Sequence, residues 1–270
     1  MTIKLDRRTF LIGAGALLGM PLIGQASALF PETLKKDTAA ADVQGGVPVL
    51  LYHDISDDFS DAYTVTATQF ASQMEWLYCN GYQAVSLKQL ADSPLPRKAV
   101  VITFDDGYAS FMDFAFPLLQ YYRFKATINI IGSYVGSYFS MNGNRPMLSW
   151  DEYRYLVAGG TVDLGCHTQK LHVFHHRGVV DVPERTLRDD LDLFQKTMTA
   201  EIGKPSEIMA WPYGFYSGNT MKIAAQAGFQ YMLTSQRGFW GSKSLKTETP
   251  RIPVGNDMDF RTFKSKLGST

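Results

Sequence analysis

Residues 99–107 of this 270-residue chain read AVVITFDDG, an apolar run that ends in two adjacent carboxylates, Asp105 and Asp106, and a glycine. A continuous apolar run of this length, bounded by turn residues, is typical of a strand buried on both faces of a parallel sheet. Similar runs recur along the chain, at residues 47–52, 83–86, 126–131, 162–166, 208–211, 231–234 and 251–254. Residues 99–104 are therefore one of several predicted parallel strands.

Helical patterns separate most of these runs. Ser149 and Glu152 have the spacing of a capping box at the start of one helix, and residues 187–198 predict a longer helix that ends near Gly203. The aromatic-rich residues 108–122 predict another helix, kinked at its proline. Strands that alternate with helices, without a break in composition, predict an α/β fold. We expect a distorted (β/α) barrel of about seven to eight parallel strands in a single domain.

The N-terminus has the features of an export signal. The pair Arg7-Arg8 precedes a mild apolar stretch, and a small-residue cleavage pattern ends at Ala28. The motif resembles a twin-arginine signal, which would engage the export machinery and deliver the chain to the periplasm. The apolar stretch is shorter than the roughly 20 residues of a membrane span. An uncleaved membrane anchor is the alternative.

The predicted division of the chain follows from this signal. Residues 1–28 form the signal peptide, residues 29–46 a flexible leader, and residues 47–270 the barrel domain. Two cysteines, Cys79 and Cys166, are too few for a disulfide scaffold. Their apolar surroundings predict two buried free thiols, and a disulfide between them in an oxidising compartment is the alternative. The sequence does not indicate an oligomeric state.

Charge and histidine content restrict the function. Lys and Arg together number 26, as do Asp and Glu, so the chain lacks the basic excess of a nucleic-acid-binding protein. Only five histidines occur, and four of them fall between His167 and His176. This clustering predicts a site.

Polar residues follow several predicted strands, where the active sites of β/α barrels lie. The pair Asp105 and Asp106 ends one strand, and His167 follows another, with His172 five residues further on. One carboxylate with two imidazoles is a common catalytic zinc set that leaves a position open for water. His53 follows the first strand.

These motifs, together with Trp211-Pro212-Tyr213-Gly214, occur in the order seen in polysaccharide deacetylases. Over residues 47–255 the chain resembles this NodB-homology family, carbohydrate esterase family four. The opening Leu51-Tyr52-His53-Asp54, the five-residue histidine spacing and the Trp-Pro-Tyr-Gly motif are most similar to exported poly-β-1,6-N-acetylglucosamine N-deacetylases. The resemblance implies a metal-dependent hydrolase that removes N-acetyl groups from an N-acetylated polysaccharide.

The resemblance also implies a role for each matching residue. Asp106, His167 and His172 would hold one divalent metal ion, with Zn²⁺ as the default and Ni²⁺ or Co²⁺ as alternatives. Asp105 would be the general base that takes a proton from the attacking water. The backbone N–H of Tyr213 would stabilise the oxyanion.

The chain lacks two residues of the family pattern, and another residue must take over the role of each. Ala210 stands where the family usually has an arginine beside the catalytic carboxylate, and we expect Arg251 to replace it. The family commonly supplies its general acid from a late histidine, yet no histidine follows His176. We therefore expect His53 to protonate the leaving amine.

Less specific interpretations remain open for several residues. Trp211, with Tyr213, could stack on a sugar ring, although core packing would also explain Trp211. His53 could be only a hydrogen-bonded residue at a strand end, and Arg251 only part of a structural ion pair. We expect His175 and His176 to be solvated loop residues. Peptidoglycan or chitin as the substrate, or a non-catalytic glycan-binding protein, are the alternative functions.

Overall fold

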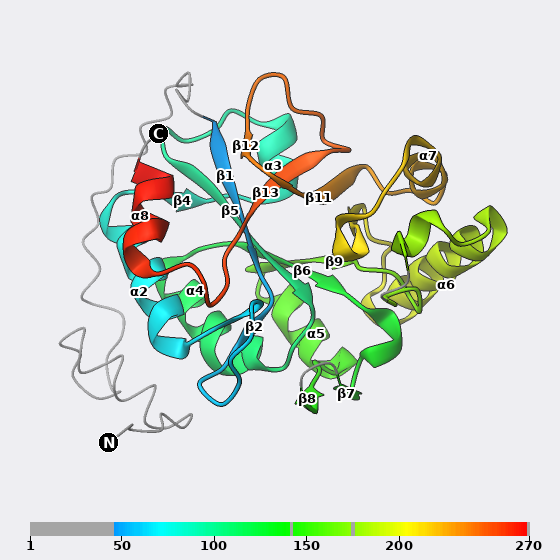
Figure 1. Ribbon diagram of the computed structural model, residues 1–270, viewed down its shortest axis with the longest axis horizontal. Helices are drawn as coiled ribbons and strands as arrows, with labels where there is room; N and C mark the ends of the chain where they lie inside the picture. Colours follow the sequence, from blue (N-terminus) through cyan, green and yellow to red (C-terminus); the bar gives the residue numbers. More distant parts are fainter. Residues whose placement is uncertain (1–45, 141–142, 174–175, 269–270) are drawn as a thin grey trace.

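The computed structural model describes residues 46–140, 143–173 and 176–268 (Figure 1). The predicted signal peptide, residues 29–45 of the predicted leader, and His175 lie outside the described residues. None of the helices in the described part of the chain has both the length and the apolar character that crossing a membrane requires.

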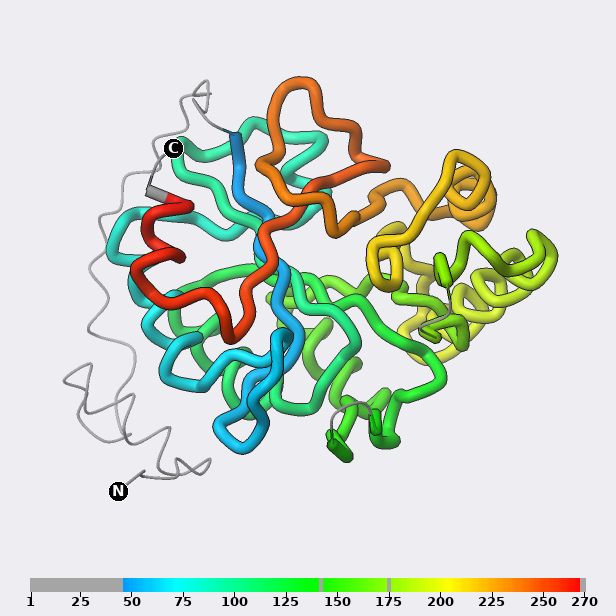
Figure 2. Tube along the Cα trace, viewed as in Figure 1, coloured from blue at the N-terminus to red at the C-terminus, as the bar shows by residue number. Residues whose placement is uncertain are grey.

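Seven parallel strands form a closed barrel, which confirms the predicted fold class. In spatial order they are β1 (Val47–Tyr52), β13 (Thr249–Pro253), β11 (Tyr231–Arg237), β10 (Ile208–Ala210), β9 (Val162–Cys166), β6 (Ala126–Ile130) and β5 (Ala99–Asp106). The barrel closes at β1, where Leu50 pairs with Ile102 of β5 on one side and with Ile252 of β13 on the other. The first and last barrel strands therefore lie side by side, as Figure 2 shows in blue and orange-red.

The eighth predicted strand is not part of the barrel. Residues 83–86 contribute only the short β4 (Gln83–Ala84), which pairs with the start of β5 and lies outside the closed ring. Further short strands pair locally: β2 (Asp54–Ile55) with β3 (Thr64–Val65), β7 (Tyr138–Phe139) with β8 (Arg145–Pro146), and β12 (Phe239–Trp240) with β1. The barrel therefore has seven strands rather than eight.

Helices surround the barrel. They are α2 (Ala67–Cys79), α3 (Leu87–Asp92), α4 (Phe116–Tyr122), α5 (Trp150–Ala158), α6 (Glu184–Ile202), α7 (Gly218–Gln226) and α8 (Phe260–Gly268). The capping box of Ser149 and Glu152 starts α5 as predicted. The end of α6 is also as predicted, because Gly203 takes the left-handed conformation there at φ 86°. The helical pattern in the sequence thus located these two helix ends.

The helix predicted over residues 108–122 is observed from Phe111 onward, with an irregular first part. A short π-helix, η1 (Phe111–Ala115), comes first, and α4 begins where it ends. Pro117 lies in the first turn of α4, directly after the π-helix. The change from π-helical to α-helical hydrogen bonding therefore lies next to the proline, whose missing N–H interrupts a regular helix.

The largest core lies between the barrel and the surrounding helices. Fully buried side chains from both layers meet there, including Tyr52, Phe70, Phe104, Leu119 and Phe194. The aromatic rings of Tyr52 and Phe104 stack with their centroids 5.3 Å apart. This packing fixes the strand ends that carry the polar residues.

The prediction of two buried thiols is half wrong. Both cysteines are free, but only Cys166 is buried, at the end of β9, whereas Cys79 is exposed at the end of α2. Met74 and Leu77, which precede Cys79 in sequence, lie on the side of that helix that faces the core, whereas Tyr78 is exposed like Cys79.

Candidate active site

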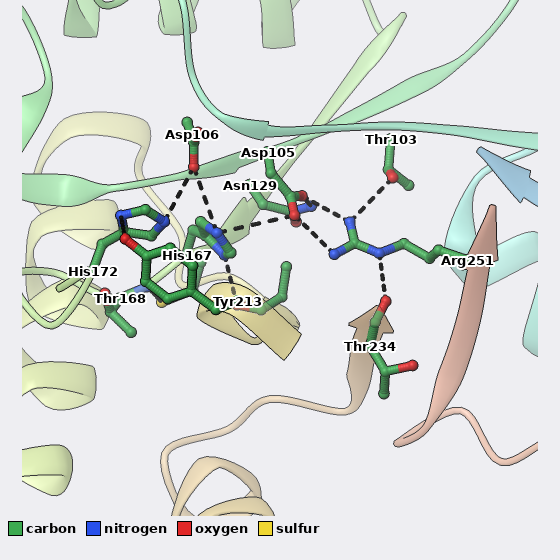
Figure 3. Close-up of polar contacts among 12 residues, drawn as sticks. Thr103, Asp105, Asp106, Asn129, His167, Thr168, His172, Tyr213, Thr234 and Arg251 are labelled. Carbon is green, nitrogen blue, oxygen red and sulfur yellow. Dashed lines mark hydrogen bonds and ion pairs between the residues drawn. The ribbon is translucent and has the colours of Figure 1, made fainter. Parts of the chain in front are cut away.

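The predicted site residues gather at the carboxyl ends of the barrel strands (Figure 3). Asp105 and Asp106 end β5, and His167 directly follows β9. Tyr213 belongs to the short helical turn η4 (Pro212–Gly214) after β10, and Arg251 comes from β13. Residues distant in sequence thus meet because parallel strands end at the same rim.

The backbone at the end of β5 turns sharply. Asp106 takes a left-handed conformation at φ 73°, which is uncommon for any residue but glycine. Gly107 follows at φ 95°, and a Cβ there would lie 2.2 Å from the hydroxyl oxygen of Tyr153. The turn separates the two carboxylates, so that each meets a different set of partners.

Asp106, His167 and His172 form one compact group. Oδ1 of Asp106 lies 3.5 Å from Nε2 of His167 and 3.4 Å from Nε2 of His172. All three residues are buried, and one potential ligand atom from each lies within 4.8 Å of the others. They are the only group of three or more such side chains with this geometry among the described residues.

The polar atoms of this group fit a metal ion. Nδ1 of His167 lies 2.8 Å from the carbonyl oxygen of Ala210, so Nδ1 carries the proton and Nε2 presents a lone pair. Oδ1 of Asp106 is buried and has no hydrogen-bond donor in the described structure. Electron-rich atoms that face one another without a donor need a cation between them, and two imidazoles with one carboxylate suit a divalent transition metal.

The protonation states of the histidines agree with this interpretation. Burial lowers the pKa of His167 to about 4, against the opposing effect of the Asp105 charge. Burial also lowers the pKa of His172 to about 4. Both imidazoles are therefore neutral near pH 7, which is the form that binds a metal.

Asp105 has a different environment, in which Arg251 and Asn129 donate hydrogen bonds to its carboxylate. Nη1 and Nη2 of Arg251 donate to Oδ1 and Oδ2 of Asp105, each at 2.8 Å. Nδ2 of Asn129 donates to Oδ1 at 2.7 Å. Of these two donors, only Arg251 donates to Oδ2, which lies 3.9 Å from Nε2 of His167. One oxygen of Asp105 thus retains a free acceptor position toward the three-residue group.

The two adjacent carboxyls have opposite pKa shifts. Burial alone would raise the pKa of Asp105, but the Arg251 charge, aided by His167, holds it well below its usual range. Burial raises the pKa of Asp106, and the His53 and His167 charges oppose that shift. Of the two carboxyls, Asp105 therefore stays ionised to the lower pH.

Arg251 is fixed along its whole length. Its side chain is only 1% exposed, and Nε donates to the carbonyl oxygen of Thr234 at 2.8 Å. From β13 it reaches past β1 to β5, where Nη1 also lies 3.3 Å from Oγ1 of Thr103. Arg251 thus contacts the carboxylate that it was predicted to pair with.

Tyr213 lies against the second histidine. Its backbone is left-handed at φ 56°, and its hydroxyl lies 3.4 Å from Nδ1 of His172. The rings of Tyr213 and His172 are 4.7 Å apart, and the ring of Phe139 contacts His172 from another side at 5.7 Å. Tyr213 is half-buried, so part of it is accessible at the rim.

His53 lies at the same rim. His53 directly follows β1, and its ring lies 5.0 Å from that of the exposed Tyr63. His53 itself is half-buried, which leaves it accessible to a molecule bound at the rim.

A buried ionic network supports the segment that follows His53. Arg145 is 3% exposed, and its Nη1 donates to Oδ2 of Asp54 at 3.0 Å and to Oγ1 of Thr64 at 2.9 Å. Its Nη2 donates to Asp61. Arg145 thus ties β8 to residues 54–64 beside the site.

The interpretation of Trp211 as a sugar platform is corrected. Its side chain is 1% exposed and belongs to the main core, where its ring stacks against that of Tyr216 at 6.2 Å. Both faces of a ring this deeply buried are covered by protein, so a sugar cannot stack on it. Core packing accounts for Trp211.

Asn129 is a site residue that was not predicted from the sequence. It is fully buried in β6, one residue from the end of that strand, and its amide reaches Asp105. A single amide side chain within the apolar run at residues 126–131 was a usable signal, because an unpaired buried amide is costly. Arg145 was not predicted either, because its partners lie far from it in sequence.

Comparisons with known proteins agree with this geometry. Residues 92–232 match the profile of the family described as polysaccharide deacetylase. A poly-β-1,6-N-acetyl-D-glucosamine N-deacetylase of Escherichia coli K12 is 25% identical over 260 residues, an alignment that covers 82% of this chain but only 38% of the relative's length. The enzyme of the same name from Staphylococcus aureus MSSA476 is 27% identical over 202 residues, covering 72% of this chain and 69% of the relative.

Solved structures show the same fold. IcaB from Ammonifex degensii superposes with a TM-score of 0.73 at 26% identity, covering 83% of this chain and 97% of that protein. A de-N-acetylase from Aggregatibacter actinomycetemcomitans superposes with a TM-score of 0.69 at 25% identity, covering 82% of this chain and 99% of that protein. With its family profile spanning more than half of the sequence and its seven-stranded barrel, the chain belongs to the polysaccharide deacetylase family.

Proposed function

We propose that this chain hydrolyses the N-acetyl groups of an N-acetylhexosamine polysaccharide, and that the polysaccharide is poly-β-1,6-N-acetylglucosamine. The observation that carries the reaction is the contrast between the two carboxylates. Asp106 faces two neutral imidazoles, whereas the adjacent Asp105 is held ionised by Arg251. A metal site with a separate carboxylate base is what amide hydrolysis by an activated water requires.

Asp106, His167 and His172 would hold one divalent metal, with Zn²⁺ as the first candidate and Ni²⁺ or Co²⁺ as alternatives with the same donor preference. When bound, the metal lowers the pKa of water and polarises the acetamide carbonyl. His167 is oriented for this role by its Nδ1–H bond to Ala210.

Asp105 is the proposed general base, and Oδ2 is the proposed proton-accepting atom. Oδ1 already accepts from Arg251 and Asn129, while Oδ2 accepts from Arg251 alone and faces His167. Oδ2 takes a proton from the attacking water, and the water oxygen bonds to the acetyl carbonyl carbon. Arg251 keeps the carboxylate in place and ionised before that transfer.

The remaining roles concern the oxyanion and the leaving group. The backbone N–H of Tyr213, in a turn that its left-handed conformation fixes, donates to the developing oxyanion. His53 protonates the amine as the C–N bond breaks, so that acetate and a free amine leave. The position of His53 at the rim, directly after β1 and next to Tyr63, supports this assignment.

The substrate proposal rests on two likenesses. The relatives from Escherichia coli and Staphylococcus aureus bear the name poly-β-1,6-N-acetyl-D-glucosamine N-deacetylase, and the chain has the Tyr-His-Asp and Trp-Pro-Tyr-Gly motifs that resemble theirs. The chain spans only 38% of the Escherichia coli relative, so the likeness concerns the barrel.

We also propose that residues 1–28 direct export through a twin-arginine signal cleaved near Ala28, which brings the barrel domain of residues 47–270 to the periplasm. The support is the Arg7-Arg8 motif and the apolar stretch that follows it. Replacing both arginines with lysine should block export. Continued processing would contradict the twin-arginine route.

An acetate-release assay tests the proposed function. Purified protein is supplied with β-1,6-linked N-acetylglucosamine oligomers, chitin oligomers or peptidoglycan, with and without a chelator. We expect chelator-sensitive release, fastest from the β-1,6-linked oligomers. Faster release from chitin or peptidoglycan would show that this polymer is the substrate instead. Binding of any of the three without release would indicate a non-catalytic glycan-binding protein.

A further inference from the structure

The segment that links the two histidines has a strained backbone. Thr168, next to His167, takes a left-handed conformation at φ 70°, which is unfavourable for a β-branched residue. Its hydroxyl is buried and has no hydrogen-bond partner within the described structure, so its own side chain does not stabilise this conformation. The contacts that hold the segment must therefore come from elsewhere.

Asp190 of α6 provides such a contact. Its Oδ2 accepts the backbone N–H of Gln169 at 2.8 Å, and its Oδ1 accepts the backbone N–H of Lys170, also at 2.8 Å. The carboxylate is buried, and it comes from the long helix on the flank of the barrel (Figure 2). One side chain thus binds two successive amides immediately after Thr168.

The opposite side of the segment is held by backbone atoms. The N–H of Gly132 donates to the carbonyl of Thr168 at 3.0 Å, and the N–H of Ser133 donates to the carbonyl of Gln169 at 2.7 Å. A Cβ at Gly132 would lie 2.0 Å from Oε1 of Gln169, so the two chain segments approach closely. Residues 168–170 are therefore held on one side by the turn after β6 and on the other side by α6.

We propose that Asp190 is a positioning residue for the metal site: by fixing the amides of Gln169 and Lys170, it holds His172 at the correct distance from Asp106 and His167. His172 is only two residues beyond the second clamped amide, and its Nε2 lies 3.4 Å from Oδ1 of Asp106. A site whose ligands are already in place binds its metal without paying an entropic penalty for ordering them. This inference rests on the proposed function only in requiring that the three-residue group bind a divalent metal.

The role requires a carboxylate. An ionised carboxylate accepts hydrogen bonds at both oxygens and donates none, which matches two N–H groups. Asparagine has the same shape but would point an NH₂ donor at one of the two amides. Asp190→Asn therefore removes one hydrogen bond and introduces donor–donor repulsion, while it leaves the packing of α6 unchanged.

The test measures metal binding by Asp190→Asn, with Asp192→Asn as the matched control on the exposed side of the same helix. Zn²⁺ affinity is measured by competition with a chromophoric chelator, and Co²⁺ reports coordination geometry through its visible absorption. We expect Asp190→Asn to bind Zn²⁺ about 10- to 100-fold more weakly, with an altered Co²⁺ spectrum. Asp192→Asn should match the wild type in both.

Unchanged affinity and an unchanged Co²⁺ spectrum in Asp190→Asn would overturn the inference. Hydrogen exchange in the metal-free wild-type protein keeps it testable if the variant does not fold. The amides of Gln169 and Lys170 should exchange slowly, and exchange as fast as in an exposed loop would overturn the inference. A wild-type protein that binds no metal would overturn the proposed metal-dependent function as well, so the two failures are distinguishable.

Discussion

The guanidinium of Arg251 binds both oxygens of Asp105 at 2.8 Å, although 146 positions separate the two residues in the chain. This contact joins the last barrel strand to the strand that carries the proposed base, across the intervening β1. A bidentate arginine both orients a carboxylate and stabilises its charge. Arg251 therefore controls the direction in which Asp105 accepts a proton and the pH at which it can do so.

Arg251→Leu should shift the pH dependence of the reaction. The Arg251 charge holds the pKa of Asp105 below its usual range, against the effect of burial. Its removal raises that pKa, so the base becomes protonated at a higher pH and the acidic limb of the kcat/KM profile moves upward. The profile of the variant is compared with that of Arg185→Leu, a change at an exposed arginine on α6. An acidic limb that stays in place would show that Asp105 is not the titrating base.

Asp105→Asn and Asp106→Asn form a matched pair, because the two carboxyls are adjacent and equally buried. Asp105→Asn should lower acetate release about 10²- to 10⁴-fold while the protein retains its metal. Asp106→Asn should lose metal, because an amide is a weaker ligand than a carboxylate. Elemental analysis and acetate release on both variants check this assignment. Metal loss in Asp105→Asn with retention in Asp106→Asn would exchange the two roles.

The sequence predicted the barrel and most of the site for a physical reason. Buried parallel strands are apolar throughout, so polar residues at their ends, such as Asp105 and His167, contrast with the rest of the strand. Barrel closure was harder to predict. Residues 83–86 have the composition of a strand, but only two of them pair, and β1 bypasses them to pair with β5.

Most polar contacts between residues that are distant in the chain could not be predicted from the sequence. From the sequence, Arg145 and Asp190 would be predicted to be surface charges, because no neighbouring residue indicates a buried partner. Trp211 shows the opposite error, since its motif suggested a sugar contact and its ring packs in the core. Arg251 could be identified from the sequence because the resemblance requires a cation and Arg251 begins a predicted strand.

Arg145→Met should destabilise the protein. Arg145 is the buried partner of Asp54 and also binds Asp61, and methionine fills similar space without charge. Removing one partner of a buried ion pair leaves an uncompensated charge, which costs about 3–5 kcal/mol in unfolding free energy. Denaturant unfolding of the variant measures this cost. A loss no larger than that of Arg185→Met would show that the network adds little to stability.

The two metal-site histidines should titrate unusually low in the metal-free protein. Burial holds the pKa of His167 and His172 at about 4, whereas an unfolded histidine titrates near 6.5. Between these values the unfolded chain binds more protons than the folded one, so both histidines contribute stability above pH 6.5 that is lost as the pH falls toward 4. NMR titration of the imidazoles checks the values. Titration near pH 6.5 for either ring would contradict them.

The His53→Gln variant should slow only the step in which the leaving group is protonated. An amine must be protonated to leave, whereas the 4-nitrophenolate released from an activated acetyl ester leaves without a proton. If His53 is the general acid, the variant should lose about 10²- to 10⁴-fold in N-acetyl hydrolysis while keeping most of its esterase activity and all of its metal. Asp105→Asn serves as the control, because loss of the base should slow both substrates. Equal losses on amide and ester in His53→Gln would assign His53 to positioning or water activation, and an unchanged amide rate would remove it from the mechanism.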